Sequence, residues 1–178
     1  MIHNCPKTSI LASGFTLIEL VVGISIIILI TGAGIAGFVN FNDRQQVRTT
    51  VKDTQALMRS AQIKARSGEG ASDCGGTNKL KGYEVTSDAT SVVLNRICVT
   101  VAGAFASRTE RSRVTLNNVT VTKAPNNAIT FLALRGGVDL GGAGVTDVTY
   151  TVAGEYSTSI EYEFQVLNTG EITEGAFN

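Results

Sequence analysis

Histidine, proline and tryptophan are scarce in this chain, and the scarcity of histidine narrows its chemistry. The 178 residues include no tryptophan, two prolines and a single histidine, His3. Beyond residue 3, therefore, no imidazole is present to activate a nucleophile or to bind a metal ion. We accordingly expect a protein that is not an enzyme and that carries no cofactor and no metal.

Neither sign of charge is in excess. Fifteen lysines and arginines balance fifteen aspartates and glutamates, so that the formal net charge is +0. No overall field therefore draws the chain to nucleic acid or to acidic lipid. Charge is also missing locally, because Glu19 is the only charged side chain between Lys7 and Asp43.

The stretch around that glutamate is a long apolar run. Residues 15–39 contain only four polar side chains, namely Thr16, Glu19, Ser25 and Thr31. As a helix the run would extend about 37 Å, which exceeds the ~30 Å hydrocarbon core of a bilayer. We predict a membrane span. Small residues at 12–14 precede the run, whereas the cleavage site of an ordinary secretory signal follows its apolar region.

Glu19 is costly inside such a span. An acid near the centre of a membrane helix is disfavoured by roughly 3 kcal/mol on insertion scales. Cleavage between Gly14 and Phe15 would create a new α-amine four positions before Glu19, on the same helix face. The amine that pairs with the carboxylate could belong to the same chain or to a neighbouring one. The alternative is that the Glu19 side chain merely reaches the membrane interface.

The segment "GFTLIELVV" (14–22) resembles the prepilin motif of type IV pilins and pseudopilins. The resemblance implies that residues 1–14 are a leader removed by prepilin peptidase after Gly14. It further implies that the amine of Phe15 is methylated and that Glu19 registers each subunit against the terminus of the next. The partners implied are prepilin peptidase, other pilin or pseudopilin subunits bound through the amino-terminal helix, and membrane lipid.

The same resemblance implies a location and an orientation. The chain would cross the cytoplasmic membrane once, through a transmembrane and assembly helix at 15–41, and would be assembled into a pilus or pseudopilus. Its carboxy-terminal domain would lie outside. One observation opposes this orientation: Arg44, Arg48 and Lys52 follow the span and outnumber Lys7 before it, against the positive-inside rule. We give the motif more weight.

A second helical segment follows directly. Residues 42–67 contain no glycine or proline, and their apolar and small side chains recur at steps of 3 and 4 in one stripe: Val47, Val51, Thr54, Met58, Ala61 and Ala65. This spacing predicts an amphipathic continuation of the first helix, buried against a sheet. The alternatives are a coiled-coil seam and a cofactor-binding face. Gly68 and Gly70 are expected to end the helix.

The remainder, 68–178, has the alternation of β-strands. We predict strands at 81–86, 91–101, 113–122, 128–134, 145–152 and 159–167, with a short last strand after the turn at 168–172. The fold class expected is therefore α+β, a long amino-terminal helix packed on one antiparallel sheet of six or seven strands. As a pilin-like domain, this part would lie in the periplasm or outside the cell.

Three cysteines are present, and Cys5 lies in the expected leader. The remaining two, Cys74 and Cys98, are 24 positions apart. In an exported domain this pair suggests a disulfide, which would stabilise the fold by about 3 kcal/mol in the chain-entropy model. Two buried thiols are the alternative.

Two stretches resemble a narrower subgroup of the family. The segments 128–140, "AITFLALRGGVDL", and 166–172, "VLNTGEI", are similar to minor pilins and pseudopilins of the kind of the type II secretion H subunit and the pilus-biogenesis T protein. Some members of the T-protein subgroup bind DNA through basic loops and tails. Here the tail "EITEGAFN" is acidic and has no arginine, but three arginines cluster in an expected loop: Arg108, Arg111 and Arg113.

Three functions are therefore weighed. The first is a structural subunit, a minor pilin or pseudopilin of a type IV pilus or a type II secretion-like filament. The second is a membrane-tethered DNA-binding minor pilin for DNA uptake, using the three arginines as phosphate contacts. The third is an exported soluble domain behind an ordinary signal peptide, cut near residues 34–36.

Overall fold

The computed structural model describes residues 14–134, 137–156 and 160–177. Within them the chain forms the long helix α1 (Leu17–Ser67), a short 3-10 helix, η1 (Ser72–Cys74), and nine strands. Two compact units are present: the first ends at Phe38 and the second begins at Val39.

In the first unit α1 is apolar and exposed on all sides. The helix is long and apolar enough to cross a membrane, and none of its most apolar stretch is buried. Leu17, Ile18 and Leu29 are among the side chains that are more than 70% exposed. The predicted helical form of this run is confirmed. Its surface has the composition expected of a segment whose surroundings are apolar.

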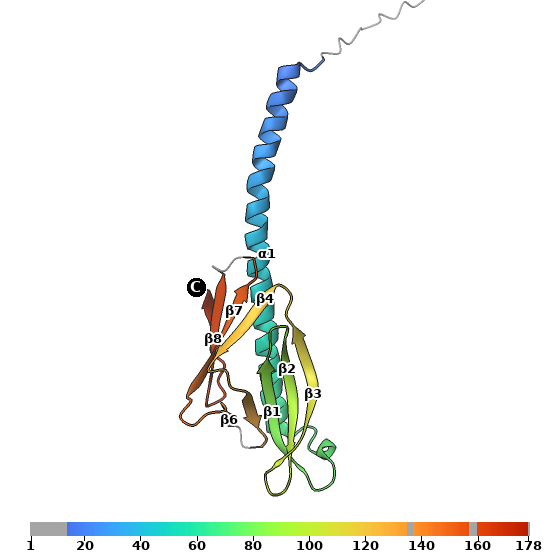
Figure 1. Ribbon diagram of the computed structural model, residues 1–178, viewed down its shortest axis with the longest axis vertical. Coiled ribbons are helices and arrows are strands. Elements are labelled where there is room, and N and C mark those ends of the chain that lie inside the picture. Colours follow the sequence, from blue (N-terminus) through green and yellow to red (C-terminus); the bar gives the residue numbers. More distant parts are fainter. Residues whose placement is uncertain (1–13, 135–136, 157–159, 178) are drawn as a thin grey trace, which may run out of the picture. The chain divides into compact units, whose positions relative to one another are not determined.

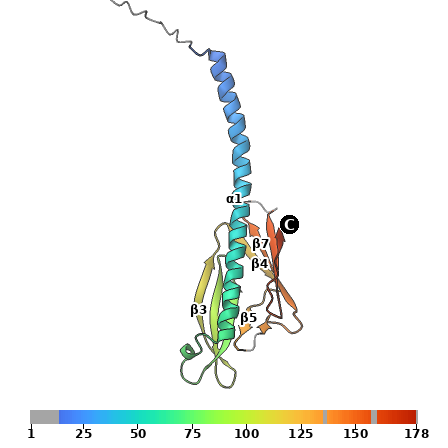
Figure 2. The same cartoon turned by 180° about the vertical axis from the view of Figure 1, so that it is seen from behind.

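In the second unit α1 has the predicted buried stripe. All six stripe side chains are at most 3% exposed, namely Val47, Val51, Thr54, Met58, Ala61 and Ala65. Figure 2 shows this part of the helix lying across the strands. The helix ends as expected just before Gly68, whose φ of 66° is a conformation that glycine adopts readily. The Glu69 N–H there donates to the Lys64 carbonyl over 3.1 Å, which satisfies an end-of-helix acceptor.

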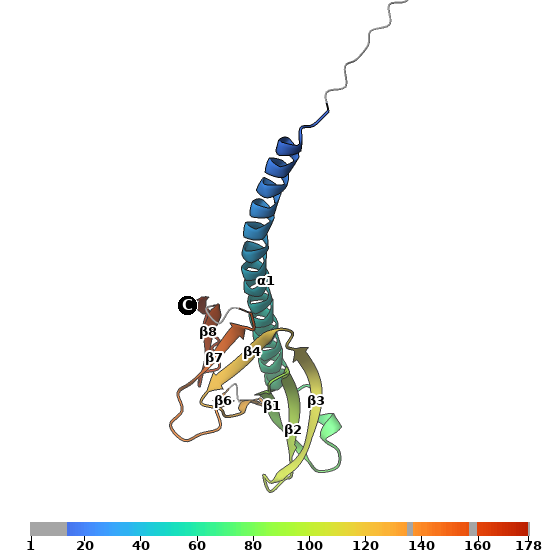
Figure 3. The same ribbon diagram turned by 45° about the horizontal axis from the view of Figure 1, so that its top comes forward.

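Nine strands form two antiparallel sheets. In sheet A the strand order is β3-β2-β1-β5-β6, and in sheet B it is β4-β7-β8-β9. The strands of sheet A are β1 (Lys79–Ser87), β2 (Ser91–Val99), β3 (Phe105–Thr115), β5 (Ile129–Leu132) and β6 (Val138–Asp139). Those of sheet B are β4 (Val119–Ala124), β7 (Asp147–Gly154), β8 (Glu161–Leu167) and β9 (Ala176–Phe177). Figures 1 and 3 show β1–β3 beside one another and β4 beside β7.

The α+β class is confirmed, but the expectation of a single sheet was wrong. The predicted strand 113–122 is broken, because β3 ends at Thr115 and β4 begins at Val119 in the other sheet. Asn118 between them has a φ of 55°. This left-handed conformation interrupts an extended chain, and asparagine tolerates it better than most residues. The chain changes sheets at this turn.

Both sheets and the second-unit part of α1 share one core. Strand β7 alternates strictly, with Val148, Tyr150 and Val152 fully buried. The Tyr150 ring stacks on that of Phe164 in β8, with centroids 5.2 Å apart. Val47 and Met58 of α1 belong to the same cluster of buried side chains. The second unit is therefore held together mainly by burial of apolar surface from all three layers.

The carboxy-terminal segment is fixed to the helix by aromatic contacts. The ring of Phe177 lies edge-on to Tyr162 with centroids 5.0 Å apart. The guanidinium carbons of Arg44 and Arg48 lie 4.7 Å and 5.6 Å from the Phe177 centroid. Both distances are within the range of cation–π attraction. Strand β9 thus joins β8 to the exposed side of α1.

Candidate functional site

The motif residues stand at the start of α1 in an open position. Gly14, Phe15 and Thr16 precede the helix without regular secondary structure. A Cβ placed on Gly14 would have no atom within 4 Å, and Phe15 is 83% exposed. The backbone between Gly14 and Phe15 is therefore sterically accessible to an enzyme that acts on an extended chain.

Thr16 caps the helix, a role that the sequence interpretation missed. Its Oγ1 accepts a hydrogen bond from the Glu19 N–H over 3.3 Å, and its carbonyl accepts from the Leu20 N–H over 3.2 Å. Thr16 and Glu19 have the Thr-x-x-Glu spacing of a capping box. This spacing in the sequence could therefore have predicted that the helix begins after Thr16. Glu19 therefore also lies where a negative charge is favoured by the helix dipole.

Among the residues that the structure describes, Glu19 has no cation near it. Its side chain is exposed, and no lysine or arginine lies within 4.0 Å of it among the residues the structure describes. From Gly14 to Asn42 no other side chain is charged. In an apolar environment the carboxylate would need a cation supplied by a chain terminus or by another molecule.

The two cysteines of the second unit lie next to each other. Cys74, in η1, and Cys98, in β2, form a disulfide. The short helix η1 is also held by the buried guanidinium of Arg96, whose Nη1 lies 2.5 Å from a carboxylate oxygen of Asp73 in η1. The Tyr83 hydroxyl donates to the Glu69 carbonyl over 2.8 Å. Burial of that hydroxyl, together with the negative charge of Glu69, raises the pKa of Tyr83.

Removal of the disulfide is expected to destabilise the second unit. Replacing both Cys74 and Cys98 with serine should lower the free energy of unfolding by about 3 kcal/mol, because the crosslink closes a loop of 24 positions. Pulse proteolysis of the detergent-solubilised chain across a urea series would measure the change. Cys5→Ser is the matched control and should leave the midpoint unchanged. An equal shift in the control would contradict the expectation.

The three arginines weighed as DNA contacts lie on a strand, not in the predicted loop. Arg108, Arg111 and Arg113 all belong to β3. The prediction failed because a polar, charged sequence was taken as a turn, whereas pairing with β2 over the full strand holds this segment extended. The arginines lie at an edge of sheet A, since none of the described strands pairs with the other side of β3.

Each of these arginines has an acidic neighbour. Arg108 lies 2.8 Å from Glu84, and Arg113 lies 2.8 Å from Glu110. The side chain of Arg111 is 4.0 Å from Asp73. Hydrogen bonding to Arg113 lowers the pKa of Glu110. The cations are thus largely compensated within the chain, which weakens their attraction for a polyphosphate.

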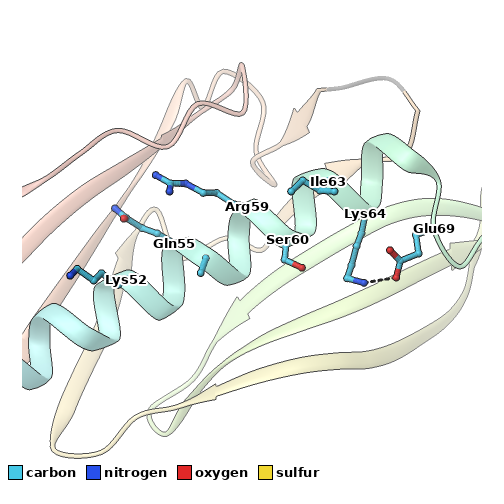
Figure 4. A pocket seen from close by; sticks show the side chains of 8 residues that line it. Lys52, Gln55, Arg59, Ser60, Ile63, Lys64 and Glu69 are labelled. Carbon is cyan, nitrogen blue, oxygen red and sulfur yellow. Dashed lines mark hydrogen bonds and ion pairs between the residues drawn. The ribbon is translucent and has the colours of Figure 1, made fainter.

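A groove runs along the exposed side of α1 in the second unit. Its volume is about 540 Å³, and its lining includes Lys52, Gln55, Arg59 and Ile63. Figure 4 shows Lys52, Gln55 and Arg59 projecting from one side of the helix, while Lys64 is paired with Glu69. Within the described ranges, no three His, Cys, Asp or Glu residues are placed to hold a metal ion.

Some sequence predictions lie outside the described residues. They include the leader 1–13 with His3, Cys5 and Lys7, and residues 135 and 136 of the stretch 128–140. The side chains at 34–36, the alternative cleavage site, are also not described. The described parts of the stretch 128–140 include β5 and β6, and the turn 168–172 follows β8.

Comparison with solved structures identifies a similar fold. The chain resembles the type IV minor pilin FimU of Pseudomonas aeruginosa in one crystal form, with a TM-score of 0.50 and 12% identity, over 75% of this chain and 91% of FimU. A second crystal form of FimU gives a TM-score of 0.46 and 12% identity, over 74% and 91%. No family model and no curated protein matches the chain. The first likeness shows a pilin-like fold.

Proposed function

We propose that this chain is a structural subunit of a type IV pilus or of a type II secretion-like filament, as a minor pilin or pseudopilin. Its work is mechanical, the packing of subunits into a filament. The observation that carries the proposal is the position of Glu19, five residues after an open Gly14–Phe15 junction at the start of an exposed apolar helix. The pilin-like fold supports it.

The proposal divides the chain into four parts. Residues 1–14 are the leader, 15–41 the transmembrane and assembly helix, 42–67 its amphipathic continuation and 68–178 the outer β-rich domain. Prepilin peptidase cleaves after Gly14, and the new amine on Phe15 is methylated. The subunit then stands in the cytoplasmic membrane, with its β-rich domain outside, until it is assembled.

The physical basis of assembly is a charge pair in lipid. A carboxylate in the span lacks the hydration that stabilises it in water, so a nearby cation lowers its free energy substantially. Cleavage supplies such a cation, the α-amine of Phe15. In a bundle of helices the amine of one subunit can reach Glu19 of the next, and this contact fixes their axial register.

Processing is the first step to test. Protein extracted from membranes that contain prepilin peptidase is expected to begin at Phe15 with a methylated amine. Its mass should be that of the chain without residues 1–14, plus one methyl group. Intact-mass and amino-terminal peptide measurements would detect both changes. The matched control is the same chain expressed without the peptidase, which should retain its leader.

Two results would contradict the proposal. One is a leader that stays attached when the peptidase is present. The other is a chain that begins near residues 34–36, which would instead fit an exported soluble domain behind an ordinary signal peptide.

A further inference from the structure

The exposed side of α1 in the second unit carries cations without acidic partners. Arg48, Lys52 and Arg59 are spaced by four and seven positions, which places them on one helix face. All three side chains are exposed. No aspartate or glutamate stands three or four positions from any of them, and none lies within 4.0 Å among the described residues. We call these three residues the basic helix face.

The outer side of sheet B carries acids without basic partners. In β8 the side chains of Phe164 and Val166 are buried, so Glu161 and Glu163 point to the opposite side. Two exposed glutamates follow in the segment beside β8. In the described ranges no lysine or arginine lies within 4.0 Å of these carboxylates. We call the four residues the acidic sheet face: Glu161, Glu163, Glu171 and Glu174.

Among the described residues, no ion pair joins the two faces within one chain. Arg48 lies beside the ring of Phe177, whereas Lys52 and Arg59 project from the exposed side of α1. Glu161 and Glu163 are opposite the buried side of β8. Lys52, Arg59 and the two glutamates are therefore turned away from the core that the helix and sheet B share. Complementary faces that point outward from one core are free to meet between separate molecules.

We propose that the basic helix face of one copy binds the acidic sheet face of a second copy of this chain. Such a contact joins two different surfaces, so each copy retains one unused face of each kind. A heterologous contact of this type continues from copy to copy, and it produces an open helical series when the rotation does not close a ring. The groove beside Lys52 and Arg59 and the exposed side chain of Ile63 extend the contact beyond the charges.

This inference rests on the proposed function, because the contact is too weak to form unless the membrane helices bring the copies together. Exposed ion pairs are individually weak, so three or four of them would not hold two free molecules together. Copies already gathered by their membrane helices meet at a high effective concentration, at which weak contacts become populated. The charges then select the register between neighbouring β-rich domains, as complementary surfaces do in other assemblies.

A photo-crosslink from the basic helix face tests the proposal. Gln55, between the cations, is replaced by a benzophenone amino acid in the full chain, which is expressed in its membrane with a second copy carrying a different tag. Irradiation is expected to join the two tagged copies. Trypsin should then yield peptide 53–59 linked to peptide 136–178, which contains all four glutamates.

Charge reversal supplies the decisive comparison. Arg59→Glu alone and Glu163→Lys alone are each expected to reduce the crosslink at least fivefold, and the two together should restore it to within twofold. Lys79→Glu, at an exposed cation outside both faces, is the matched control and should have no effect. Retention of the Cys74–Cys98 disulfide reports that each variant is folded.

The alternatives give distinct results. A crosslink to the same chain, to lipid or only to another protein would overturn the proposal, as would no crosslink or one that is insensitive to charge reversal. Cleavage after Gly14 is measured in the same samples. An uncleaved wild-type chain counts against the proposed function, whereas a cleaved chain without the crosslink counts only against this contact.

Discussion

Replacing Glu19 with glutamine is expected to reduce incorporation of the chain into filaments about 100-fold. Removing one member of a desolvated charge pair costs about 3 kcal/mol, and each 1.4 kcal/mol is tenfold in an equilibrium constant. Glutamine keeps the size of the side chain and can still serve in the capping box with Thr16. Immunoblots of sheared filaments against the membrane fraction would measure the loss.

Thr16→Ala separates the charge from the cap. This variant removes the hydroxyl that accepts the Glu19 N–H but leaves the carboxylate in place. Loss of an N-cap costs about 1 kcal/mol, so the reduction should be below tenfold. Both variants should still be cleaved after Gly14. Two results would contradict charge pairing as the basis of assembly. One is a Glu19→Gln variant that enters filaments as well as the wild-type chain does. The other is a Thr16→Ala variant whose incorporation falls as much as that of Glu19→Gln.

Replacing Phe164 with alanine is expected to lower the free energy of unfolding of the second unit by about 3–5 kcal/mol. The side chain is 1% exposed and stacks on Tyr150 with an interplanar angle of 9°. Truncation leaves a cavity between the ring of Tyr150 and the rest of the core. The Tyr150 hydroxyl is already buried without a partner among the described residues. A urea unfolding curve of the detergent-solubilised chain, followed by pulse proteolysis, gives the change.

Phe105→Ala is the matched control for this truncation. It removes the same atoms from a side chain that is 65% exposed at the start of β3. The expected change is within about 0.5 kcal/mol, since exposed positions away from special contacts contribute little. Similar losses in both variants would indicate that sheet B does not contribute its aromatic pair to a shared core.

The sequence predicted the helix and its buried stripe because both depend on neighbours within a few positions. A period of 3 and 4 places Val47, Val51 and Met58 on one side whatever they pack against. The end of the helix was equally local, since Gly68 has the left-handed conformation that glycine favours. The Thr-x-x-Glu cap was also local, and its omission was a failure to weigh Thr16 rather than a lack of signal.

The sheets were less predictable because strand pairing is not local. The alternation of residues in β7 predicted which side of the strand is buried. It did not indicate which strands would pair with β7. The turn at Asn118 looked like the interior of one strand, and it sends the chain into the second sheet. The charged segment 106–113 looked like a loop, yet its pairing with β2 makes it part of strand β3.

Whether an individual charged side chain is buried or paired could be established only from the tertiary structure. Asp43 follows the apolar run and would be taken for an exposed charge, but it is fully buried. Its carboxylate lies against Gly154, where a Cβ would be 3.1 Å from Oδ2. Arg108 likewise meets Glu84, 24 positions earlier, only because β1, β2 and β3 align in this register.

By itself the sequence determined the apolar span, the acid within it and the junction before it, since these are contiguous residues whose chemistry does not depend on folding. It also determined the face of the second helical segment that would be buried. Only the tertiary structure decided the division into two sheets and the internal pairing of the β3 arginines. It also showed that Arg48, Lys52 and Arg59 have no acidic side chain within 4.0 Å in the described part of the chain. The physical reason is that an ion pair depends on distances of a few ångströms, and these are set by strand register and packing between residues far apart in the chain.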